Sequence, residues 1–109
     1  MLPGRTAAAR QPEEASMVTF LMMGKYSDES LRDASADRTT RVVQLLESNG
    51  GKVKSIFALL GHYDIALMAQ FDTVENAMKA SVALNKFTGI AFETMPAVSV
   101  EDFDKMLAE

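Results

Sequence analysis

The chain has 109 residues, of which 48% are hydrophobic, carries a formal net charge of -4 and contains no cysteine. This length encloses a single small core, and the lack of cysteine excludes disulfide bonds and thiolate metal sites. The acidic balance argues against nucleic acid or an anionic membrane as a partner, and no apolar run approaches the ~20 residues that cross a bilayer.

Residues 1–16, MLPGRTAAARQPEEAS, are typical of a disordered tail. They are mostly small, polar or charged, and they lack the apolar stretch of a secretory signal. Strong apolar patterning begins at Met17. We therefore expect residues 17–109 to form one domain, and the cysteine-free chain to work in the reducing cytoplasm.

The first half of the domain predicts a strand followed by a helical region. Residues 17–24 are too short for a stable helix and place apolar side chains on both faces, which is typical of a buried strand. Ser27 is a good N-cap for a helix, and Ser35 offers a second cap that can break or bend this helix near residue 36. The sequence Asn-Gly-Gly at residues 49–51 ends the helical region, because glycine accepts the left-handed conformation.

Two more strands form a predicted hairpin. Residues 52–60 and 64–71 are separated by only three residues, Gly61, His62 and Tyr63, which is too few for anything but an antiparallel connection. Gly61 most plausibly provides a positive φ or a close backbone approach.

The last third of the chain predicts a helix, a strand and a short terminal helix. Thr73 caps a helix at residues 74–87, and Gly89 ends it. Residues 90–98 form the fourth strand, which belongs at a sheet edge because Pro96 cannot donate a ladder hydrogen bond. Residues 100–107 form the terminal helix.

This order of elements predicts an α+β, ferredoxin-like βαββαβ fold with antiparallel sheet order 4-1-3-2. The strand directions place the loops at residues 24–27, 61–64 and 88–89 at one rim of the sheet. Asp64 is therefore expected beside Lys25, as a turn residue that makes an ion pair or, as the alternative, a catalytic carboxylate.

The predicted helices cover only one face of the sheet, although the strands offer apolar side chains to both. In the third strand, Ile65, Leu67 and Phe71 point to one face and Ala66 and Met68 to the other. A large exposed apolar face usually marks an interface. We expect at least a homodimer, with sheet packed against sheet. The alternative is that the terminal helix folds back over this face.

Six stretches of the chain resemble one family of small bacterial proteins. They are TFLMMGKYS, GGKVKS, ALLGHYDI, AMKASVAL, TGIAFETMPAVSV and EDFDK, within residues 17–105. Together they resemble the GYD domain family, named after its Gly-x-Tyr-Asp step, for which the resemblance implies no general reaction. More distantly, the Gly-x-Tyr-Asp hairpin and the later Thr-Gly-Ile resemble the effector-binding module of Lrp/AsnC-type regulators. That resemblance implies a dimeric α/β barrel that binds small metabolites between protomers.

Candidate site residues gather at the predicted rim and barrel interior. His62 could act as a general base or bind a metal, but it is the only histidine and has no cysteine partner. We therefore expect no metal, no cofactor and no catalytic residue. Tyr63 is expected to pack at the rim with its hydroxyl on water or a carbonyl group, or, as the alternative, to cap a ligand. The ligand-binding candidates are Phe20, Met22, Lys25, Tyr26, His62, Tyr63, Asp64 and Met68.

Two functional hypotheses remain from the sequence. The favoured one is an oligomeric module that binds a small molecule or a protein, with apolar residues holding the ligand and the rim closing over it. The alternative is a cofactor-independent enzyme, similar to small dimeric-barrel monooxygenases and isomerases, that acts on an apolar substrate. RNA-recognition modules share this sheet topology, but the methionine-rich and aliphatic face lacks their basic and aromatic signature.

Overall fold

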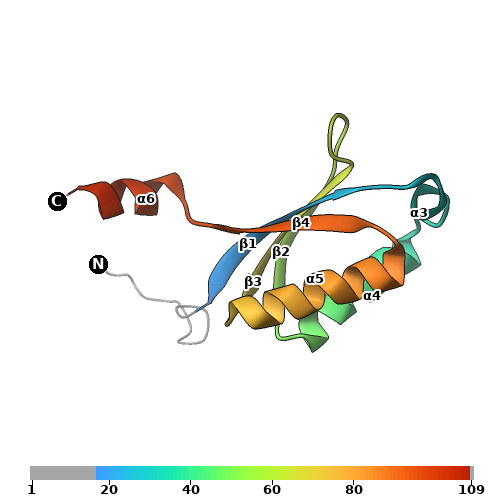
Figure 1. Cartoon of the computed structure of the whole chain (residues 1–109), viewed down its shortest axis with the longest axis horizontal. Helices are drawn as coiled ribbons and strands as arrows, with labels where there is room; N and C mark the ends of the chain where they lie inside the picture. The colour runs from blue at the N-terminus through green and yellow to red at the C-terminus, as the bar shows by residue number, and fades with distance from the viewer. Residues whose placement is uncertain (1–16, 109) are drawn as a thin grey trace.

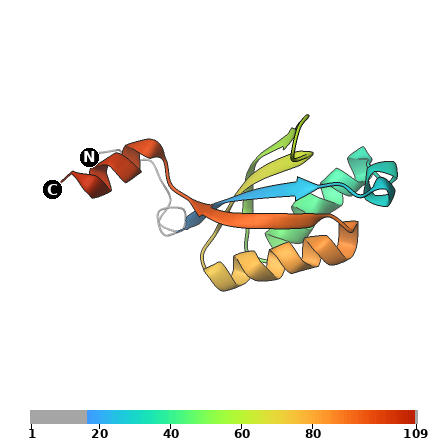
Figure 2. The ribbon, with the colours of Figure 1, turned by 45° about the horizontal axis from the view of Figure 1, so that its top comes forward.

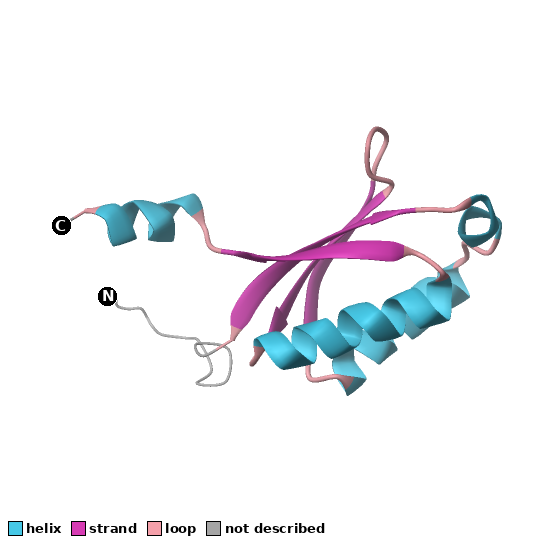
Figure 3. Ribbon diagram, in the orientation of Figure 1, coloured by secondary structure: helices cyan, strands magenta, loops and turns pink. Residues whose placement is uncertain are grey.

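A computed structural model describes residues 17–108 of the chain (Figure 1). The expected tail at residues 1–16 lies outside the described residues. The elements, drawn by type in Figure 3, follow the predicted order. They are β1 (Val18–Lys25), α3 (Asp28–Arg32), α4 (Ala36–Ser48), β2 (Lys52–Ala58), β3 (Ile65–Phe71), α5 (Val74–Thr88), β4 (Ala91–Ala97) and α6 (Val100–Leu107).

The four strands form one antiparallel sheet in the order β2-β3-β1-β4, which is the predicted order read from the opposite edge. Met22 in the central strand β1 lies between Leu67 of β3 and Thr94 of β4. Pro96 is on the edge strand β4, as its missing N–H group required.

Local capping explains where the helices begin and end. The Ser27 side chain accepts a hydrogen bond from the Ser30 backbone N–H, and the Ser35 side chain accepts one from that of Arg38. The two caps divide the first helical region into α3 and α4, so the predicted break is confirmed. Helix α5 begins after Thr73 and ends at Gly89, whose φ of 76° is the left-handed conformation that favours glycine.

The core lies between the sheet and helices α4 and α5, which cover the same face (Figure 2). The rings of Phe20 and Phe71 pack edge to face with their centroids 6.0 Å apart. The largest side chains that are completely buried are Met22, Leu46, Leu67, Phe71 and Leu84. They come from both layers, so the core joins sheet to helices.

The other face of the sheet is not covered by a helix of the described chain. Figures 1 and 2 show α6 projecting beyond the end of β4, away from the sheet. Only two residues separate β4 from α6, and the helix continues outward instead of turning back. The alternative in which the terminal helix folds over the open face is therefore wrong for a single chain. Within residues 17–108, no helix has the length and apolar character needed to cross a membrane.

Candidate functional site

The open face of the sheet, meaning the face opposite α4 and α5, carries a continuous apolar surface. The register of the strands places two neighbouring rows of side chains across this face. Each row contains one residue from each strand, in the order β2-β3-β1-β4. The first row is Ser55, Met68, Leu21 and Met95, and the second is Phe57, Ala66, Met23 and Glu93. The side chains of Met68 and Met95 are 40% and 38% exposed in the single chain. Because the rows are mostly methionine and aliphatic residues, this face suits an apolar partner.

The rim at one end of this face is formed by the β2–β3 hairpin and the end of β1. The N–H of Asp64 donates to the carbonyl oxygen of Gly24 over 2.9 Å, and the Asp64 carboxylate accepts from the N–H of Tyr26 over 2.8 Å. The Nζ of Lys25 donates to the carbonyl oxygen of His62 over 3.0 Å. These contacts bring Lys25, Tyr26, His62 and Asp64 together at one rim.

The expected ion pair between Lys25 and Asp64 is wrong. Lys25, at the end of β1, instead hydrogen-bonds the backbone of the hairpin, and Asp64 of the hairpin hydrogen-bonds the backbone just after β1. The two contacts together hold the hairpin against the end of β1. Backbone N–H and C=O groups in loops need hydrogen-bond partners. Here the side chains of Lys25 and Asp64 provide those partners and do not bind each other. Gly61 has a φ of 141°, so the expected positive φ at this glycine is confirmed.

Tyr63 connects the hairpin to the edge strand β4. Its hydroxyl donates to Oε1 of Glu93 on β4 over 2.9 Å, and the ring of His62 packs edge to face on its ring with centroids 4.9 Å apart. The hydrogen bond to Glu93 raises the pKa of Tyr63, with smaller contributions from desolvation and from the charge of Glu93. The expected water or carbonyl partner is therefore corrected to a carboxylate.

The sequence reasoning missed Glu93 as a member of this rim. Glu93 pairs with Met23 in the register between β1 and β4, so its side chain shares the open face. A register for the edge strand was the only signal that could have found it, because nothing in the local sequence links the two residues.

Tyr26 faces the helical side of the rim. The guanidinium group of Arg38 lies 5.7 Å from the centre of the Tyr26 ring and also donates to the carbonyl oxygen of Ser30. Both side chains line an enclosed cavity of about 60 Å³, together with Ile56, Ile65 and other apolar residues. A cavity of this size holds a few water molecules, and ligand pockets are typically several times larger.

The apolar candidates do not line one pocket. Phe20 and Met22 are 2% and 0% exposed beneath the helices, whereas Met68 lies on the open face. The register explains this separation, because Met68 pairs with Leu21, one residue away from either of them. The expectation that Phe20, Met22 and Met68 hold one ligand is therefore corrected. Within the described residues, no three histidine, aspartate or glutamate side chains gather as metal ligands would.

Comparisons with known proteins place the chain in a family. Residues 20–107 match the family model of the GYD domain. The chain belongs to the GYD domain family. The match runs from Phe20 in β1 to Leu107 at the end of α6, so the resemblance read from the Gly-x-Tyr-Asp step is confirmed.

Two of the solved structures similar to this GYD domain carry the names of regulatory proteins. The leucine response regulatory protein LrpA of Mycobacterium tuberculosis has 11% identity and a TM-score of 0.59, with 90% of this chain and 62% of that chain covered. An AsnC family transcriptional regulator from Agrobacterium tumefaciens has 13% identity and a TM-score of 0.57, with 87% and 60% covered. The GYD domain thus spans about three fifths of those chains, and the likeness shows the fold alone. A comparison with curated proteins gives no significant match.

Proposed function

We propose that this GYD domain is a homo-oligomeric binding module that pairs with a second copy through the open face of its sheet. The observation that carries the proposal is the pair of apolar rows on that face, which no described element of the same chain covers. A soluble protein rarely leaves such a face in water, and an identical face on a second copy matches it in polarity and can pair with it about a two-fold axis.

The proposed ligand is a small, largely apolar molecule held between the two sheets. Near α6 the open face borders a hollow of about 640 Å³ lined by Thr19, Met68 and Gln70, and this hollow is open to solvent on one side. The second copy would supply the opposite wall. Met23 and Phe57 lie in the row beside the rim, where Tyr63 and Glu93 provide polar groups. The hydroxyl proton of Tyr63 is already donated to Glu93, so the hydroxyl oxygen of Tyr63 can still accept a hydrogen bond from a ligand.

The fold of the two regulators supports this proposal by analogy only. One of them is described as a leucine response regulatory protein, which names a response to a small molecule. At 11% identity the likeness carries no residue of a binding site to this chain. The chemistry of the ligand must therefore come from the open face and rim of this protein.

A charge in the open face tests the assembly. Met68→Asp should place an unpaired carboxylate between the sheets, which costs about 3 kcal/mol or more and weakens a dimer about a hundredfold. Leu60→Asp is the matched control, because Leu60 lies in the hairpin loop and is 96% exposed. Sedimentation velocity of both variants measures the assembly. A folded Met68→Asp protein that assembles like the unmodified chain would refute the proposed pairing.

Native mass spectrometry of the purified full-length chain tests ligand binding. We expect the mass of an even-numbered oligomer with a small molecule retained, and its loss in Phe57→Asp, which adds charge to the row beside the rim. His62→Ala should keep both folding and assembly, because His62 is exposed and contributes its carbonyl oxygen to Lys25. A defined turnover that disappears in His62→Ala would favour an enzyme over a binding module.

A further inference from the structure

Helix α6 is an amphipathic helix with an uncovered apolar side. Its apolar residues Val100, Phe103, Met106 and Leu107 are between 48% and 74% exposed, and none of its residues is buried. An isolated helix of eight residues is not stable in water, because the cost of nucleation exceeds what one or two turns return. Its apolar side therefore needs a surface to pack against.

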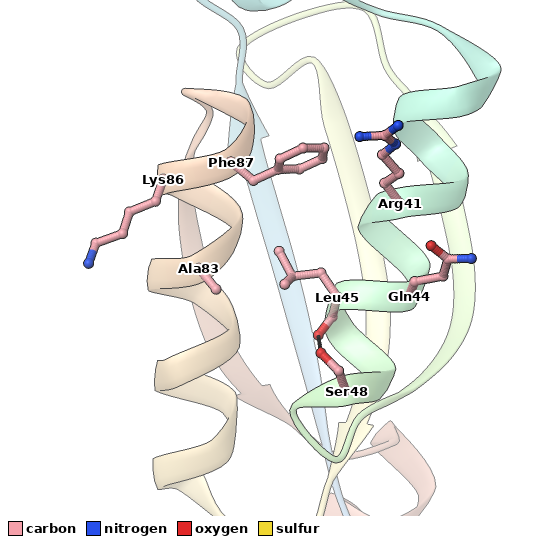
Figure 4. Close-up of a pocket in the computed structure, with 7 residues that line it drawn as sticks. All are labelled: Arg41, Gln44, Leu45, Ser48, Ala83, Lys86 and Phe87. Carbon is pink, nitrogen blue, oxygen red and sulfur yellow. Dashed lines mark hydrogen bonds between the residues drawn. The ribbon is translucent and has the colours of Figure 1, made fainter.

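The helical layer of the same protein carries a groove of matching character. The groove has a volume of about 630 Å³ and lies between α4 and α5. Figure 4 shows Leu45 and Ala83 facing each other across it, with Phe87 and Arg41 pointing toward one another at one end. Gln44 and Ser48 on α4 and Lys86 on α5 complete its lining. The floor is thus apolar and the borders are polar or cationic.

The charges beside the helix and beside the groove are opposite. At about 100° per residue, Asp102 and Asp104 fall on the two sides of the stripe formed by Val100, Phe103 and Leu107. Arg41 stands on the α4 border of the groove and points across it, whereas Lys86 stands on the α5 border with its side chain extended away from the groove (Figure 4). Two acids flank the apolar helix face, and two bases flank the apolar groove.

Arg41 remains able to bind a further carboxylate. Its Nε lies 3.2 Å from Oδ2 of Asp37, and the two side chains are 63% and 77% exposed. Such an exposed pair contributes little to stability. The terminal nitrogens of the guanidinium group can still donate to an incoming acid.

The helix cannot reach the groove of its own chain. The groove lies at the end of α5 that leads into β4, whereas α6 follows the far end of β4. The seven residues of β4 separate the two by roughly 23 Å. The two residues between β4 and α6 span only about 7 Å. A contact between this helix and this groove therefore requires two molecules.

We propose that α6 of one molecule docks in the groove between α4 and α5 of a second copy, with Asp102 and Asp104 beside Arg41 and Lys86. This contact uses the helical layer and leaves the open face of the sheet free. It is therefore a second interface, independent of the sheet pairing proposed above, and the two interfaces together build an assembly larger than a dimer.

Engineered cysteines test the contact directly, because the natural chain has none. Full-length Met106→Cys protein is mixed with full-length Ser48→Cys protein under mild oxidation, and the mixed disulfide is followed by mass spectrometry. Ser48 lines the groove, whereas Thr40 does not, so Thr40→Cys is the control partner. We expect the mixed disulfide with Ser48→Cys to form roughly tenfold faster or more than with Thr40→Cys, because docking raises the effective concentration.

A third partner separates the groove from the open face. Ser55→Cys places a thiol in the first row of the open face. A mixed disulfide that forms faster with Ser55→Cys than with Ser48→Cys would overturn the proposal and assign α6 to the sheet of the second copy. Equal rates with Ser48→Cys and Thr40→Cys would also overturn it. Repeating the reaction in Met68→Asp proteins distinguishes the two interfaces, because groove docking should survive the loss of sheet pairing.

Charge exchange provides the second measurement. Arg41→Glu and Lys86→Glu together in the Ser48→Cys protein should slow the mixed disulfide about tenfold, since like charges then face each other. Asp102→Lys and Asp104→Lys in the Met106→Cys protein should restore most of the rate. Groove charge reversal without any change in rate would refute the docking.

Discussion

The hydroxyl of Tyr63 lies 2.9 Å from Oε1 of Glu93, and this contact passes over β1 to join the hairpin to the edge strand β4. Neither residue belongs to the core, and both lie at the border of the open face. The contact therefore links three strands at the point where the proposed ligand site is closed. It also fixes the direction in which the phenol hydroxyl donates.

Removing Glu93 should lower the pKa of Tyr63 toward its ordinary value. The Glu93 carboxylate accepts a hydrogen bond from the neutral Tyr63 hydroxyl and repels the negative charge of its phenolate form. Glu93→Ala therefore removes the largest cause of the raised pKa of Tyr63. A Tyr26→Phe background leaves Tyr63 as the single phenol of the chain. Spectrophotometric titration of the phenolate measures the pKa. An unchanged titration curve in Glu93→Ala would contradict the contact.

The same raised pKa predicts the pH range over which this contact stabilises the fold. A group whose pKa is higher in the folded state than in the unfolded state contributes fully below its unfolded-state pKa. The contribution is then lost as the pH rises through the folded-state pKa. We expect Tyr63→Phe to reduce the difference in stability between neutral and strongly alkaline solution, as measured by urea unfolding at both.

The Asp64 carboxylate should stabilise the fold as a hydrogen-bond acceptor for a backbone N–H group and not through its charge. Asp64→Ala leaves the N–H of Tyr26 without its 2.8 Å partner and should destabilise the fold by about 1–2 kcal/mol. Asp64→Asn keeps an acceptor oxygen in the same place and should cost less than Asp64→Ala. Urea unfolding of the two variants measures the difference. Equal losses would show that the charge, and not the acceptor, is what matters.

Gly24 should be intolerant of any side chain, and increasingly so with size. A Cβ at this position would lie 2.7 Å from Phe92 and 2.9 Å from Ile65 and Ile90, so Gly24→Ala should cost about 1–3 kcal/mol. Gly24→Leu should cost more. Gly61 is the control, since a Cβ there meets no atom within 4 Å and only its φ of 141° opposes a side chain. Gly61→Ala and Gly61→Leu should therefore differ little in thermal denaturation.

Thr88 should stabilise the end of α5 through its hydroxyl. The buried Oγ1 donates to the carbonyl oxygen of Leu84 over 2.7 Å and accepts from the N–H of Ile90 over 3.0 Å. Thr88→Val keeps the shape but leaves the Ile90 N–H unpaired, so the loss should be about 1–3 kcal/mol. Thr40→Val, at an exposed helix position, should change stability by less than about 0.5 kcal/mol. A neutral Thr88→Val would argue against this bridge.

The fold was predictable because its signals are local. Ser27, Ser35 and Thr73 cap helices through their own neighbouring amides, and Gly89 ends a helix through its own φ. Alternating apolar residues in β1 and β3 likewise specify two faces within each strand. Such features depend on a few consecutive residues, which a single sequence displays.

The site was less predictable because it depends on register and direction. Whether Met68 shares a face with Met22 or with Leu21 is decided by a shift of one residue between β1 and β3. The contact between Tyr63 and Glu93 depends in addition on the register of β4. The sequence predicted α6 as a helix, but the two residues before it carry no signal for its outward direction.

Both borders of the sheet oppose the addition of further strands. On β4, Pro96 has no N–H group to offer a new neighbour. On β2, the register shifts between Val53 and Ser55, and Lys52 and Lys54 place charge along the strand. Fibrils of the cross-β type grow by strand addition at such borders. The sheet with its methionine-rich apolar face is thus protected against edge-to-edge polymerisation, and the proposed association uses the face of the sheet and the helical layer instead.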